Sequence, residues 1–113
     1  MTTCLAWTTM ITGADGFSGV MANFHPDLYV WLLDNYKKHP DAAKKLSAQL
    51  SLLSGIERCC YPVCAKYHMG KVGVPMTLLS RVRDRADFGY LGRHEIDDLI
   101  IVEETIRELI AKV

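Results

Sequence analysis

Cysteine and histidine residues in the middle of the chain have the types and the spacing that a metal site could use. Cys60, Cys64 and His68 follow one another at intervals of four, which would put them on one face of an uninterrupted helix. Pro62 stands between the first two and would break or restart such a helix. The cysteines also lack the C-x-x-C spacing of a zinc knuckle. We therefore predict no metal site and expect free thiols that pack as small buried hydrophobes.

His25 is a second residue that could do chemistry, because it stands just before Pro26 near the end of a glycine-rich segment. Two roles remain open for it: a turn or cap residue at the start of a helix, or a catalytic group. The surrounding elements decide which of these roles its side chain can take.

Proline residues mark where these elements begin. Pro26 and Pro40 suit the first position of a helix, where a missing N–H costs nothing, and Pro62 precedes a third helix. The three helices are expected over residues 26–38, 40–58 and 63–69, with Gly55 weakening the second and Gly70 ending the third.

The last segment has the clearest helical pattern, beginning at about His94. Glu103 and Arg107 are spaced as a favourable pair on its surface. The expected apolar stripe consists of Leu99, Val102, Ile106, Leu109 and Val113, broadened by Ile96, Ile100 and Ile110.

The first part of the chain is rich in glycine. The apolar spacing between residues 3 and 12 fits a short helix that Gly13 would stop. Glycines then surround a short apolar run, which predicts a buried strand over residues 16–21. The chain has no second good strand to pair with it, so the backbone groups of this strand need partners from elsewhere. This mismatch predicts that part of a larger fold is missing.

Composition excludes several classes of partner. The charges balance to zero, and basic and acidic residues are interspersed, so we expect no nucleic-acid or membrane-surface partner. The N-terminus lacks the basic and apolar regions of a secretory signal, and the apolar runs are too short to span a bilayer. With free thiols in addition, we expect a cytoplasmic protein.

Two stretches of the chain carry a recognisable pattern. The first, residues 13–26, reads GADGFSGVMANFHP, and the second, residues 61–73, reads YPVCAKYHMGKVG. Together they resemble the last barrel strand with its loop, and the C-terminal Pro-Val helix, of the dihydrodipicolinate synthase/N-acetylneuraminate lyase family of class I pyruvate-type aldolases. The residues in matching positions are Gly13, Gly16, Ser18, Gly19, Asn23, Pro26, Pro62, Val63 and Lys66.

The resemblance implies the C-terminal part of a (β/α)8 TIM barrel, mainly α-helical in this chain. Residues 1–38 would be the last helix–strand–helix portion of the barrel. Residues 39–113 would be the C-terminal helical extension. Beyond Pro75 the similarity fades, since the sequence departs there from the Arg-x-Pro-Leu stretch that the family often has.

The resemblance also implies a chemistry whose main residues this chain lacks. Such enzymes form a Schiff base between a barrel lysine and pyruvate or another 2-keto acid, with a tyrosine as proton relay and no cofactor. Both residues would precede Met1, so the chain should be catalytically silent alone. A Schiff-base lysine must be held dry and neutral, and we expect the chain's lysines on solvated surfaces, apart from Lys66 at a structural position.

One wall of the substrate pocket is expected to remain. By the resemblance, Ser18 would line the keto-acid pocket, with Phe17 and Gly19 beside it, although Ser18 could equally be a small residue that fills a barrel layer. Asn23 is expected to brace the loop through side-chain to backbone hydrogen bonds.

The sequence thus predicts the C-terminal fragment of a 2-keto-acid lyase whose full-length form is a homo-oligomer. The alternative is a stand-alone helical interaction or oligomerisation protein without enzymatic activity, using the amphipathic last helix. A metal-binding module through the cysteines is a third, weaker hypothesis.

Overall fold

The computed structural model describes residues 10–15 and 19–113, which form helices joined by turns and loops. None of these described residues belongs to a β-strand. The prediction of a mainly helical chain is therefore confirmed, while no part of a barrel sheet is present in the described ranges. The α-helices are α2 (Pro26–Asn35), α3 (Pro40–Leu53), α4 (Val63–Lys71) and α5 (Tyr90–Ala111), and the 3-10 helices are η2 (Val20–Asn23), η3 (Ser54–Arg58) and η4 (Arg85–Asp87).

The predicted strand over residues 16–21 is wrong where the structure describes it. Residues 16–18 lie outside the described ranges, Gly19 is extended, and Val20 begins η2. The backbone N–H of Ala22 donates to the carbonyl of Gly19 at 3.2 Å. With no neighbouring strand among the described residues, this segment satisfies its backbone groups by local 3-10 hydrogen bonds instead.

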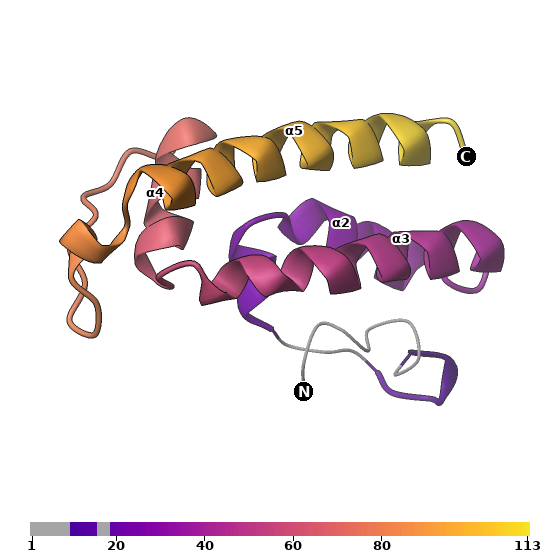
Figure 1. Ribbon diagram of the computed structural model, residues 1–113. Helices are drawn as coiled ribbons and strands as arrows, with labels where there is room; N and C mark the ends of the chain where they lie inside the picture. The colour runs from indigo at the N-terminus through magenta and orange to yellow at the C-terminus, as the bar shows by residue number, and fades with distance from the viewer. Residues whose placement is uncertain (1–9, 16–18) are drawn as a thin grey trace.

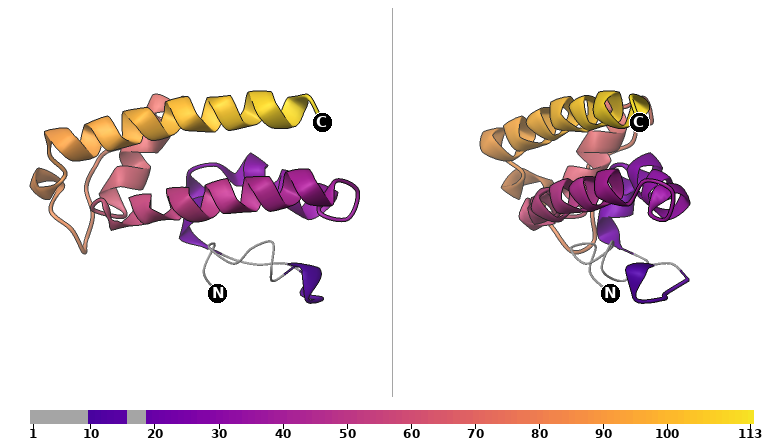
Figure 2. Two further views of the ribbon diagram at one scale, coloured as in Figure 1. Left: turned by 45° about the vertical axis from the view of Figure 1, so that its right-hand side comes forward. Right: turned by 90° about the vertical axis from the view of Figure 1, so that its right-hand side faces the viewer.

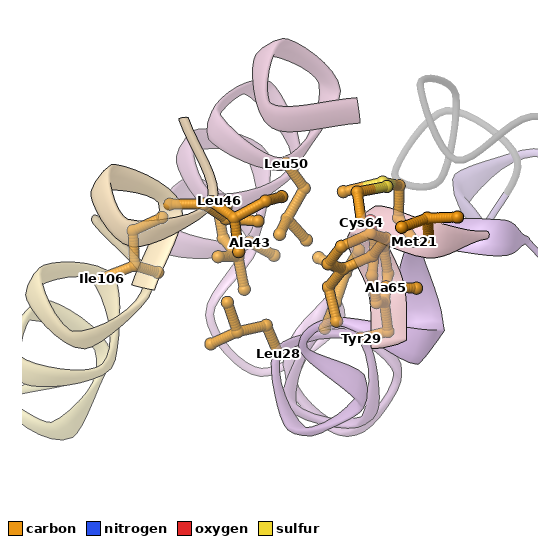
Figure 3. Close-up of a cluster of buried hydrophobic side chains, with 14 of the residues drawn as sticks. Met21, Leu28, Tyr29, Ala43, Leu46, Leu50, Cys64, Ala65 and Ile106 are labelled. Carbon is orange, nitrogen blue, oxygen red and sulfur yellow. The ribbon is translucent and has the colours of Figure 1, made fainter. Parts of the chain in front are cut away.

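The helices form two layers. Figures 1 and 2 show α5 lying over the pair α2 and α3, with α4 crossing between the layers at one end. The apolar faces of all four helices meet in one core. Figure 3 shows Leu28, Ala43, Leu46 and Ile106 directed toward one another, with Met21, Tyr29, Cys64 and Ala65 grouped beside them.

The proline boundaries agree with prediction. Pro26 and Pro40 stand at the N-terminal ends of α2 and α3, and an acidic residue, Asp27 or Asp41, follows each in the first turn. Both placements suit a helix start, because the proline lacks an N–H and the carboxylate complements the helix dipole. The helix from Pro40 changes at Ser54 to the tighter η3, which contains Gly55 and ends at Arg58.

Three helix boundaries differ from prediction, the first being the end of α2 at Asn35, before the expected residue 38. Gly70 lies inside α4, which runs to Lys71, and Gly73 just beyond its C-cap has a φ of 104°, the left-handed conformation that stops a helix. The N–H of Val74 donates to the carbonyl of Met69 at 2.8 Å and closes this end. α5 begins at Tyr90, earlier than the expected His94. At the start of the described chain, Gly13 has a φ of 101° after the helical Met10 and Ile11, as predicted for a terminating glycine.

Candidate functional site

A carboxylate occupies a core position of α5. The buried residues of this helix are Ile96, Leu99, Glu103 and Ile106, which follow one another at helical intervals of three and four. The predicted stripe is therefore wrong in part, because Val102, Leu109 and Val113 are exposed. Glu103 takes the position between Leu99 and Ile106 and is 0% exposed.

Glu103 is held by two histidines from other helices. Its Oε2 lies 2.6 Å from Nδ1 of His25, the N-cap residue of α2, and its Oε1 lies 2.7 Å from Nε2 of His68 in α4. His25 and His68 are 0% and 1% exposed. A carboxylate can only accept hydrogen bonds, so both facing ring nitrogens carry hydrogen. We call these three residues the His–Glu–His cluster.

The environment keeps Glu103 ionised. Burial alone would raise the pKa of this carboxyl, but the hydrogen bonds from His25 and His68, together with their charges, bring it below its ordinary value. Tyr29 stacks on the His25 ring with centroids 5.3 Å apart, and Phe24 meets the His68 ring edge-on at 5.2 Å. Aromatic rings thus hold both imidazoles in orientation.

A second ion pair joins the same two helices at the surface. Asp27 of α2 accepts hydrogen bonds from Arg107 of α5, at 2.7 Å from Nε and 3.1 Å from Nη2. Arg107 therefore pairs with a residue of another helix. The pairing with Glu103 along α5 that the sequence spacing predicted does not form. The guanidinium lowers the pKa of Asp27 chiefly through this hydrogen bond.

The arrangement of the cluster decides its chemistry. An imidazole oriented by a carboxylate can act as a general base when a substrate reaches its other nitrogen. Here both rings are buried, so in the described fold the cluster binds helices together instead. Over residues 10–15 and 19–113, no group of three or more His, Cys, Asp or Glu side chains has an arrangement that could hold a metal ion.

The predicted substrate residues are only partly described. Phe17 and Ser18, like the motif residue Gly16, lie outside the described residues. Gly19 is half-buried at the N-cap of η2. Asn23 donates through Nδ2 to the carbonyl of Val20 at 3.0 Å, so the predicted brace to the backbone is confirmed.

The second matched stretch lies against the first. Asn23 Nδ2 lies 3.2 Å from the hydroxyl oxygen of Tyr61, which precedes Pro62, the N-cap of α4. Lys66 is half-buried, and its Nζ donates to the backbone carbonyl of Leu79. The structure therefore brings Asn23 next to the start of α4, while Lys66 fastens the loop that follows this helix.

The cysteines behave as the sequence predicted, as far as they are described. Cys59, Cys60 and Cys64 are free, with Cys64 buried and the other two half-buried. Burial and the neighbouring thiols raise the pKa of Cys64 to about 12. Such a thiol is a packing residue rather than a nucleophile.

Sequence reasoning missed the His–Glu–His cluster. It assigned His25 a cap or catalytic role, assigned His68 no ligand role, and left Glu103 on the surface. One signal was available: Glu103 continues the spacing of Ile96, Leu99 and Ile106, and a charge in such a stripe requires a buried partner.

No helix among the described residues has the length and apolar character needed to cross a membrane. Comparison with protein-family models, with curated proteins and with solved structures finds no match to this chain.

Proposed function

We propose that this chain is the non-catalytic, C-terminal helical portion of a Schiff-base lyase of the dihydrodipicolinate synthase kind, acting on pyruvate or another 2-keto acid. The non-catalytic part of the proposal rests on one observation: none of the chain's lysines lies in the dry environment that a Schiff-base lysine needs. The chain's lysines all lie within the described residues, and every one except Lys66 is exposed to solvent. Lys66 is half-buried, and its Nζ is engaged in a hydrogen bond to the carbonyl of Leu79 instead of being free to attack a keto group.

The family part of the proposal is supported by the matched residues. Asn23 braces its loop and reaches Tyr61, Pro26 begins α2, and Pro62 caps α4. These are structural roles at the positions that the sequence resemblance singled out. The free thiols of Cys59, Cys60 and Cys64 further support a reducing cytoplasm as the compartment we propose.

Borohydride trapping with pyruvate tests the absence of imine chemistry. The chain is incubated with pyruvate and borohydride beside an active Schiff-base aldolase at equal concentration, and intact masses are measured. We expect the reduced pyruvyl adduct on the aldolase and none on this chain. A stoichiometric adduct on any of its lysines would overturn the proposal.

Fragment complementation tests the family itself. A barrel of this family cut after its seventh strand, which retains its lysine and tyrosine, is co-expressed with this chain. We expect the two chains to copurify and the pair to form the pyruvate imine more readily than the barrel fragment alone. Lack of association, with each chain purified separately, would contradict the assignment.

Self-association through α5 is the second candidate function, and one observation favours it. The outer side of α5 leaves apolar side chains in solvent, with Ile101 65% exposed. Next to it, a groove of about 250 Å³ between α3, η3 and α5 is lined by Leu52, Leu53, Gly55, Ile56, Glu95, Asp98, Leu99 and Val102. An exposed apolar patch of this kind is typical of an interaction surface.

Sedimentation equilibrium of the chain tests this candidate. If α5 mediates self-association, Ile101→Lys should convert an oligomer into a monomer. Ala48→Lys, which adds the same charge at an exposed position of α3, should leave the oligomer intact. A wild-type chain that is monomeric at all concentrations would exclude self-association as its function.

A further inference from the structure

The His–Glu–His cluster joins three helices at one buried point. His25 and Glu103 are 78 positions apart in the sequence, and His68 and Glu103 are 35 apart, so both hydrogen bonds exist only in the folded chain. The remaining ring nitrogens, His25 Nε2 and His68 Nδ1, are buried without a hydrogen-bond partner among the described residues. Each imidazole therefore depends on Glu103 for its hydrogen bonding in the core.

Neighbouring charges from each packed element surround this point. α2 contributes Asp27 and α5 contributes Arg107, and these two groups pair with each other beside the cluster. In α4 the cations nearest in sequence to His68 are Lys66, whose Nζ donates to the carbonyl of Leu79, and Lys71, whose ammonium lies 5.4 Å from the centre of the Tyr67 ring. α3 presents apolar side chains and the hydroxyl of Ser47 to the core. Glu103 is thus the carboxylate that both buried imidazoles contact.

We propose that Glu103 is an acid-operated latch, whose ionised carboxylate holds α5 to α2 and α4 and whose protonation releases α5. In the ionised form, the carboxylate accepts from both rings. A protonated carboxyl carries no charge, and its hydroxyl oxygen becomes a donor, so it no longer accepts from both rings. A buried ring N–H would then lose its acceptor, which costs the fold the full desolvation penalty of that group.

The direction of the pH effect follows from the lowered pKa of Glu103. A carboxyl with a lower pKa in the folded than in the unfolded chain stabilises the fold fully above the ordinary value of 4.5. That stabilisation is lost as the pH falls from 4.5 through the lowered value. Within this window, a single such group reduces the folding equilibrium constant by up to about tenfold per pH unit.

Urea unfolding of the 113-residue chain between pH 7 and pH 3 tests the latch. The variant is Glu103→Gln, which keeps the shape of the side chain and one acceptor oxygen but removes the titrating charge. The matched control is Glu104→Gln, the same change at the exposed neighbour in α5. We expect the folding equilibrium constants of wild type and Glu104→Gln to fall steeply below pH 4.5. Over the same pH range, the factor by which the folding equilibrium constant of Glu103→Gln falls should be at least ten times smaller. Parallel curves for all three proteins would overturn the proposal.

Amide hydrogen exchange on the wild-type chain keeps the test decisive if Glu103→Gln does not fold. On acidification, we expect the protection factors of residues 96–106 in α5 and 64–71 in α4 to fall at least tenfold further than those of residues 43–50 in α3. An equal loss of protection in all three helices would mean that no local release occurs, and would refute the latch.

Discussion

Glu103 Oε2 lies 2.6 Å from His25 Nδ1, which joins the last helix to a residue 78 positions earlier in the chain. This contact, and its counterpart to His68, give α5 a polar attachment inside an otherwise apolar core. Apolar packing holds helices together with little directional preference, whereas a carboxylate between two imidazoles requires one rotation of α5 about its axis. The cluster therefore accounts for which face of α5 is buried.

Removing the carboxylate should destabilise the fold strongly at neutral pH. Glu103→Ala leaves His25 and His68 buried without their acceptor and opens a cavity, so we expect the free energy of unfolding to fall by about 3–5 kcal/mol. Glu104→Ala, at the exposed neighbouring position, should change it by no more than about 0.5 kcal/mol. Urea unfolding at pH 7 measures both values, and similar losses for the two variants would show that Glu103 has no special role.

The two histidines should adopt opposite tautomers when neutral. His25 faces Glu103 with Nδ1 and His68 faces it with Nε2, so His25 should carry its hydrogen on Nδ1 and His68 on Nε2. Nitrogen chemical shifts and long-range couplings of the imidazoles distinguish the two forms. His94, exposed in α5, serves as the reference for a solvated ring. The same tautomer at both buried histidines would contradict the contact geometry.

The sequence predicts elements better than it predicts their rotation. Pro26 and Pro40 mark helix starts because their effect is local, and Asn23 bonds to a carbonyl three residues away. The earlier start of α5 escaped prediction because its first residues, Tyr90 and Leu91, are exposed and add no apolar periodicity. The burial of Glu103 was not predicted for a different reason. Its partners are far away in sequence, and the apolar periodicity of the helix places Val102 on the buried face instead.

Two glycines in and after α4 should respond oppositely to alanine. A Cβ at Gly70 or at Gly73 would meet no atom within 4 Å, so only backbone conformation distinguishes the sites. Gly70 is helical, and Gly70→Ala should stabilise by about 0.5–1 kcal/mol. Gly73 has a φ of 104°, and Gly73→Ala should destabilise by about 1–2 kcal/mol. Thermal unfolding of both variants checks the signs; a stabilising Gly73→Ala would mean that α4 does not end in a left-handed residue.

The Asp27–Arg107 pair should contribute far less than the buried cluster, although it joins the same two helices. Its side chains are 53% and 37% exposed, so water and salt screen the attraction. A double-mutant cycle with Asp27→Asn and Arg107→Gln should give a coupling of about 0.2–1 kcal/mol at low salt, shrinking in 1 M sodium chloride.

The pH dependence of this coupling has a defined sign. The lowered pKa of Asp27 means that the coupling is fully present above 3.8, the ordinary value, and disappears as the pH falls through the lowered one. Asp34→Asn, a change at an exposed carboxylate of the same helix, provides the control for general charge effects. A coupling that persists at pH 2 or in high salt would show that α2 and α5 are joined here by packing of the side-chain stems instead of by charge.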